Sequence, residues 1–316
     1  MHRLIPAICA LLAALPVRAE ETELAPERAP RRADASYREI FAGPFVSPRL
    51  FAMPVADVVG AYQISLSYDG SLLQEQGVLS SAGVFAIGFG DIAQLEYRHT
   101  SAISIQRTSA PVPSVGVQLK IPIPERRYVP AFALAFRLGV PRGETFDGVN
   151  VDETVTDLYA VSRLKLWGAL RRVTLHAGVR ASSAKIEVRG ASDREADKLL
   201  ILPAVGFEVM ANDDTRFVGE LGLVPAFDLD LETAGAMPEI GQGVQARLGV
   251  RWNLLPSFAF DASLGYQIEA ANMGGTMSRG AGAVVDWDIR LGGELFIPWG
   301  ALTCRAVGIF CDDERK

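Results

Sequence analysis

Apolar residues recur at every second position in segment after segment of this chain from about residue 59 onward. Residues 173–180 read VTLHAGVR and residues 244–252 read VQARLGVRW, so apolar side chains alternate with polar, charged or small ones. Successive side chains of a β-strand point to opposite faces, and this period of two predicts strands with one apolar and one polar face. Helical spacing is nearly absent, which favours an all-β fold.

The links between these segments are alternately long and short. About twelve segments of about ten residues succeed one another, and that length suits a tilted strand crossing a bilayer. The long, polar links are 69–77, 100–113, 141–156, 183–199, 224–242 and 269–283. The short links are 88–91, 168–172, 211–215 and 253–257, with 122–130 as a longer exception. Over residues 59–297 this pattern predicts a transmembrane antiparallel up-and-down β-barrel of about 12 strands. A soluble periplasmic β-sandwich also alternates and remains an alternative.

The first residues have the pattern of a secretory signal peptide. A short basic start with Arg3 is followed by an apolar run over 4–15 and by the small-x-small sequence Val17-Arg18-Ala19. The apolar run is too short to span a bilayer. We therefore expect residues 1–19 to be removed after Ala19 and the mature chain to be exported.

The segments that flank the barrel have different compositions. Residues 20–35 are charged and have little to bury, whereas residues 36–58 regain aromatic residues among prolines. We assign 20–58 to a periplasmic leader that is partly disordered, and expect its second half to dock against or into the alternating segments. Residues 298–316 form a C-terminal tail.

Charge and cysteine content exclude several classes of partner. The net charge of −6 argues against nucleic acid, which requires a basic face. Cys304 and Cys311 are candidates for a disulfide in an exported chain. The three histidines are scattered, so the sequence predicts no metal site and no cofactor.

Three stretches resemble bacterial outer-membrane β-barrel proteins. Residues 290–297, RLGGELFI, resemble the β-signal on the last strand of such barrels. Residues 53–60 and 88–96 resemble the start of several uncharacterised porin-like or envelope barrel families. The resemblance implies a location in the outer membrane of a Gram-negative cell envelope. It also implies contacts with outer-membrane lipid and lipopolysaccharide, and with the barrel assembly machinery during biogenesis. It names no substrate, and the oligomeric state stays open.

With the apolar face toward lipid, the polar face lines the lumen. The candidate lumen-lining residues are Glu96, Arg98, Lys120, Arg137, Arg163, Lys165, Arg180, Glu220, Arg247, Arg251, Asp286, Asp288 and Arg290. We interpret the protein as a non-enzyme, either a small polar-lined passive channel or a structural envelope protein. In a channel the basic residues would favour anions, unless the acidic ones neutralise them.

One pair of residues suggests an enzymatic alternative. His99 and Ser101 share a strand face, and their spacing is similar to the His-x-Ser pair of outer-membrane lipid A deacylases. A base that activates a nucleophile needs an orienting partner, and the sequence places no acid beside this pair. A lipid-modifying enzyme therefore remains an alternative, as does a barrel that binds a ligand through its long loops.

Overall fold

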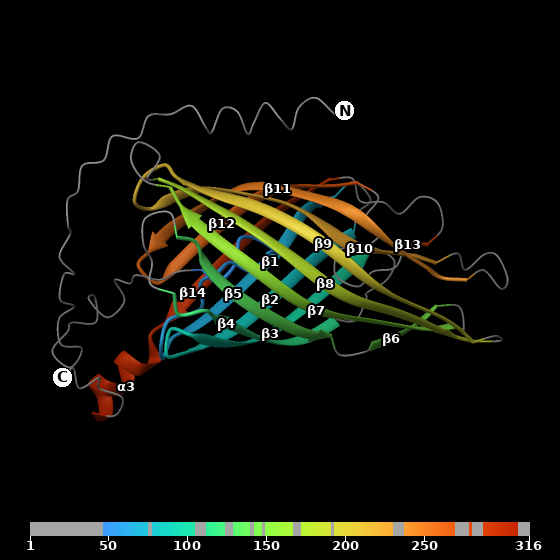
Figure 1. Cartoon of the computed structure of the whole chain (residues 1–316), viewed down its shortest axis with the longest axis horizontal. Helices are drawn as coiled ribbons and strands as arrows, with labels where there is room; N and C mark the ends of the chain where they lie inside the picture. The colour runs from blue at the N-terminus through green and yellow to red at the C-terminus, as the bar shows by residue number, and fades with distance from the viewer. Residues whose placement is uncertain are drawn as a thin grey trace.

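Most of the described chain forms one β-sheet, almost entirely antiparallel, that closes on itself (Figure 1). The computed structural model describes residues 47–74, 78–104, 112–123, 129–139, 142–146, 149–166, 172–190, 193–229, 237–268, 278–279 and 287–308. Its strands are β1 (Ile64–Gln74), β2 (Val78–Phe89), β3 (Ala93–Ser104), β4 (Val112–Lys120), β5 (Ala131–Gly139), β6 (Arg142–Phe146), β7 (Val149–Lys165), β8 (Val173–Arg189), β9 (Arg194–Met210), β10 (Thr215–Leu229), β11 (Glu239–Leu255), β12 (Phe258–Ile268), β13 (Ser278–Arg279) and β14 (Trp287–Ile297). A helix, α3 (Trp299–Val307), comes after the last strand.

Twelve of the described strands form the closed ring. Each pairs with its neighbours in sequence order, β14 pairs with β1, and β10 pairs with β11. The closing seam starts at Ile64, which lies opposite Ile297. β6 pairs only with β7, and the short β13 pairs with the end of β10. The predicted all-β barrel of about twelve strands is therefore confirmed, and its ring has no free edge.

The outer surface of the ring is apolar. Along β5, buried and exposed side chains alternate without a break, and Leu134 is 46% exposed while its neighbours Ala133 and Ala135 are buried. The outward side chains of the ring include Leu66, Phe85, Leu95, Tyr97, Val117, Leu119, Phe132, Phe136, Leu158, Val205, Phe217, Leu248 and Leu264. A continuous apolar exterior is what contact with hydrocarbon requires.

The apolar residues change from the outward face to the inward face at the end of β8 and the start of β9. Near the start of β8, Val179 faces outward, but further along the outward positions carry polar residues such as Lys185 and Glu187. There the inward positions become apolar instead, and Ile186 and Val188 are fully buried. A strand that leaves a bilayer passes from hydrocarbon into water, so the outward face must become polar at that point.

The strands continue into four of the expected loops. The links expected at 69–77, 141–156, 183–199 and 224–242 are largely strand, because β1 extends to Gln74 and β7, β8, β9, β10 and β11 run 15 to 17 residues each. Figure 1 shows β7, β8 and β9 reaching past their neighbours at the end opposite α3. In this extension Lys185 binds Glu187 and, across the strand pair, Glu195 at 2.6 and 2.9 Å. The hydrogen bond from Lys185 lowers the pKa of Glu187 below its ordinary range.

The helical content of the described residues is small. No helix among them combines the length and the apolar character needed to cross a bilayer.

A charge on the outer face tests the hydrocarbon environment. We expect Leu134→Arg to lower the free energy of unfolding by about 2–4 kcal/mol, because Leu134 lies in the middle of β5 and faces outward. Ala135→Ser, on the lumen side of the same strand, serves as the control. Urea titration of protein folded into lipid vesicles measures both. An equal effect of the two substitutions would contradict a lipid-facing exterior.

Candidate functional site: a lumen closed by the N-terminal segment

The segment before the first strand lies inside the barrel. Residues 47–62, which we call the plug, include Leu50, Val55, Ala56 and Val59, which are all at most 1% exposed. Leu50 and Val55 pack with apolar residues of the wall, among them Ala133 of β5. The sequence predicts docking of the second half of the leader, and the structure places residues 47–62 in the lumen. The first strand begins at Ile64.

The plug starts as a tight hairpin that one glutamate holds. The backbone N–H of Leu50 donates to the carbonyl of Met53 at 3.0 Å, which leaves the N–H groups of residues 51–53 pointing away from the turn. All three donate to the carboxylate of Glu220 on β10, at 3.0 to 3.2 Å. Hydrogen bonds to a charged acceptor are stronger than neutral ones, so Glu220 is a main anchor of the hairpin.

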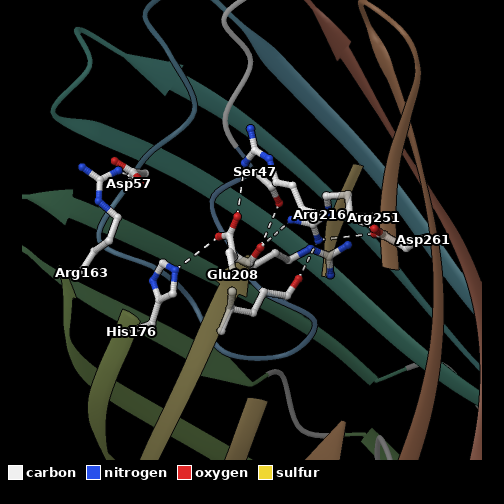
Figure 2. A network of polar contacts seen from close by, with 10 residues as sticks. Ser47, Asp57, Arg163, His176, Glu208, Arg216, Arg251 and Asp261 are labelled. Carbon is white, nitrogen blue, oxygen red and sulfur yellow. Dashed lines mark hydrogen bonds and ion pairs between the residues drawn. The ribbon is translucent and has the colours of Figure 1, made fainter. Parts of the chain in front are cut away.

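Three cationic side chains hold other parts of the plug, and Figure 2 shows two of them, Arg251 and Arg163. Arg251 of β11 donates to the backbone carbonyls of residues 49 and 50, at 3.3 and 2.8 Å, while its Nε pairs with Asp261 at 2.8 Å. Asp57 of the plug forms an ion pair with Arg163 of β7 and a second one with Lys120 at 3.4 Å. The wall therefore binds both the main chain and the charged side chain of the plug.

Two wall glutamines bind the remaining plug backbone. Gln118 Nε2 donates to the carbonyls of Val55 and Asp57 at 2.7 and 2.6 Å. Gln94 Oε1 accepts the N–H of Val59 at 2.9 Å. Both glutamines are almost fully buried. A buried backbone group without a partner is costly, and these side chains satisfy groups that no strand neighbour can reach.

The plug leaves the lumen through a hinge that α3 contacts. Tyr62 has a φ of 54°, a left-handed conformation at the turn into β1. The N–H of Gly300 donates to the carbonyl of Tyr62 at 3.1 Å, and the Trp299 ring lies edge-on to the Tyr62 ring with centroids 5.4 Å apart. A Cβ at Gly300 would lie 2.4 Å from the Tyr62 Cβ, so only glycine permits this approach.

The plug fills the half of the lumen next to the short turns. Its wall contacts lie near the ends of β4, β7 and β11 and near the start of β10, where only short links join neighbouring strands of the ring. Outer-membrane barrels keep their short turns on the periplasmic side. On that orientation the other half of the lumen lies toward the outside of the cell.

Three arginines lie in the other half, along β3, β5 and β8. Arg137 Nε pairs with Glu96 at 3.1 Å, and Arg98 Nε lies 3.7 Å from the same carboxylate. Arg137 and Arg180 both donate to the Tyr159 hydroxyl, at 3.3 and 3.1 Å, and both guanidinium groups lie over the Tyr159 ring. We call Arg98, Arg137 and Arg180 the arginine cluster.

Two further ion-pair groups line the lumen. His176 Nε2 lies 3.3 Å from Glu208, which also pairs with Arg216 at 3.2 Å (Figure 2). Asp288 of β14 accepts from Arg247 of β11 at 2.8 Å and from Arg290 at 2.5 Å. Within the described ranges, no group of three His, Cys, Asp or Glu side chains is placed to hold a metal ion.

The outer part of the lumen is more apolar than the sequence predicts. Ile186, Leu200, Leu202 and Ile240 pack there in a cluster of buried side chains. A cavity of about 50 Å³ lies between the plug hairpin and this cluster, and Tyr159 and Glu220 are part of its lining. That volume admits a few water molecules.

The candidate residues predicted from the sequence fall mostly on the lumen side. Those with described side chains inside the barrel are Glu96, Arg98, Lys120, Arg137, Arg163, Arg180, Glu220, Arg247, Arg251, Asp288 and Arg290. Lys165 is exposed at the short-turn end of β7, and Asp286 lies outside the described residues. Sequence reasoning missed Gln94 and Gln118 as plug contacts, because an uncharged polar residue on an alternating strand carries no distinctive signal.

The remaining candidate residues are the His99 and Ser101 pair and the two cysteines, Cys304 and Cys311. His99 lies beside Gly83 on the neighbouring strand, and the side chain of Ser101 is outside the described residues. Cys304 of α3 is disulfide-bonded. Cys311 lies outside the described residues, so the pairing of these two cysteines stays a prediction.

Comparisons with known proteins find similar folds among solved structures. An outer-membrane channel from Pseudomonas putida F1 superposes with a TM-score of 0.46 at 14% identity, over 79% of this chain and 98% of that one. The NanC porin superposes with a TM-score of 0.45 at 10% identity, over 74% of this chain and 98% of the porin. The KdgM porin superposes with a TM-score of 0.44 at 9% identity, over 73% of this chain and 98% of the porin. No protein-family model and no curated protein matches the chain.

Proposed function

We propose that the protein is an outer-membrane β-barrel that acts as a small, polar-lined passive channel, and that its own plug closes the channel from the periplasmic side. The mature chain would begin after Ala19. Its outer face would contact membrane lipid and lipopolysaccharide, and the barrel assembly machinery would insert it. The apolar exterior of the ring and the change of face at the outer end of β8 support the membrane location.

The observation that carries the channel function is how the lumen is filled. An eight-stranded barrel is just wide enough for side chains to fill, whereas sixteen strands or more leave an aqueous channel. A ring of twelve lies between these sizes, and here a separate segment occupies one half of it. The wall holds that segment largely through Glu220, Arg251, Asp57 and the two glutamines. Such groups can be solvated by water once the segment leaves, so the wall suits an open state as well as a closed one.

Fractionation and electrical recording together test the proposal. We expect the protein in the outer-membrane fraction and a band that shifts on SDS gels when the sample is heated. In planar bilayers the full-length chain should conduct rarely, and a chain without the plug should conduct in steady steps. A closed, heat-modifiable barrel that never conducts without its plug would contradict the channel function and leave a structural role.

A further inference from the structure

The arginine cluster contains donor groups that no described residue satisfies. Arg98 Nε and Nη2 and Arg180 Nη2 are buried and have no hydrogen-bond partner among the described residues. The side chains of Arg98 and Arg180 are each only 16% exposed. Most buried polar groups in folded proteins are hydrogen-bonded, so donors in this state mark a place where another molecule supplies the acceptor.

The charges around the cluster do not balance. Glu96 faces Arg98 and Arg137, while Asp157 faces Arg180 and accepts from the hydroxyls of Ser182 and Tyr159. Three guanidinium groups thus share two carboxylates. The plug adds another positive charge nearby, because Arg49 donates to Ser67, which lies level with Arg98 across β2. The cluster therefore carries a net positive charge.

A glycine keeps the wall open beneath the cluster. Gly116 of β4 lies between Glu96 of β3 and Arg137 of β5 in the strand register. A Cβ at Gly116 would lie 3.0 Å from Arg137 Cγ, so a larger residue would push the arginine away from its carboxylate. The same register places Glu96 and Arg137 one inward position beyond Gln118, which binds the plug, toward the long-link ends of the strands. The cluster therefore borders the plug hairpin on its loop side, where Tyr159 and Arg180 line the cavity beside Ala52 and Met53.

We infer that the arginine cluster binds a small oxyanion, a carboxylate, phosphate or sulfate group, that enters the lumen from the loop side. Guanidinium groups present paired donors that match such groups, and Arg98 and Arg180 have donors without a hydrogen-bond partner in the described part of the chain. As a statement about the transported solute, the inference rests on the proposed channel function. As a statement about binding, it stands on the cluster itself.

Titration calorimetry of the full-length protein in detergent tests the site. Sodium sulfate, inorganic phosphate and citrate are titrated separately at constant ionic strength set with chloride. We expect saturable binding of at least one of them, and the strongest of the three identifies the preferred oxyanion. Arg98→Gln should weaken that binding by about tenfold or more. Arg98→Lys keeps the charge but not the paired donors, so its affinity for the oxyanion should lie between those of the unmodified protein and the Arg98→Gln variant.

The controls separate binding from folding and from conduction. Arg290→Gln removes a lumen arginine whose donors are satisfied by Asp69 and Asp288, and should bind like the unmodified chain. Heat-modifiable migration verifies each barrel, and Arg180→Gln replaces Arg98→Gln if the latter does not fold. Absence of saturable binding to the unmodified protein, or equal binding by the Arg98→Gln variant, would overturn the site. Binding without conduction would retain the site and remove the channel.

Discussion

A chain that lacks residues 48–58 is expected to hold an open pore where the full-length chain is closed. The deletion removes the hairpin that Glu220 binds and the carboxylate that pairs with Arg163. It leaves every pairing of the ring in place, because the first strand begins at Ile64. Steady single-channel steps in planar bilayers, against rare openings in the full-length chain, are the expected record.

A point substitution gives the same test without shortening the chain. Glu220→Gln keeps the shape of the side chain but removes the charge that three backbone N–H groups share. We expect it to destabilise the closed state by about 2 kcal/mol, or about thirtyfold in the ratio of open to closed channels. Glu294→Gln is the matched control, because Glu294 is a buried lumen glutamate that accepts from Ser65 of the wall and, among the described residues, makes no hydrogen bond to the plug. If both glutamine variants conduct alike, Glu220 does not anchor the plug.

The ring was predictable from sequence because lipid and lumen impose opposite chemistry on alternate residues. On β5 that rule holds over the whole strand, so a simple count of alternation recovers both its face and its length. The extension of β8 was not recognised, although a signal was present. The apolar residues move from odd positions, such as Val179, to even ones, such as Ile186, where the strand leaves the membrane. An interpretation that requires one fixed apolar face ends the strand at that change.

The plug was only partly predictable, for a physical reason. Its backbone groups are bound by side chains from distant strands, such as Gln118 and Glu220, so it needs no period of its own. Aromatic residues among prolines suggest only that residues 36–58 dock against something. Several partners of residues 47–62 come from strands over a hundred residues further along the chain, and only the closed ring brings them together.

Inward-facing glycines between charged residues are a signal that sequence reasoning did not use. Gly116 separates Glu96 from Arg137, and Gly265 of β12 separates Arg247 from Asp288. A charged pair two strands apart can meet only if the strand between them carries no side chain at that level. Alternation identifies each residue as inward-facing, but the register that aligns the three becomes visible only in the folded sheet.

The second of these pairs has the largest expected effect on stability. We expect Asp288→Asn to lower the free energy of unfolding by about 3–5 kcal/mol, because removing one partner leaves buried charges uncompensated. Arg247 and Asp288 have side chains only 3% and 2% exposed, and Asp288 also binds Arg290. A Cβ at Gly265 would lie 2.1 Å from Asp288 Oδ1, so the strand between them offers no replacement partner. Urea unfolding in lipid vesicles, monitored by tryptophan fluorescence, measures the loss.

Two variants decide whether that loss comes from the buried pair. Asp213→Asn changes an exposed aspartate in the turn before β10 and should alter the free energy of unfolding by less than about 0.5 kcal/mol. Adding Arg247→Met to Asp288→Asn removes one of the charges left without a partner, and should restore part of the stability. If Asp288→Asn alone matches Asp213→Asn, water solvates this wall of the lumen well enough to replace the carboxylate. The interior would then be hydrated on the β11–β14 side even while the plug is in place.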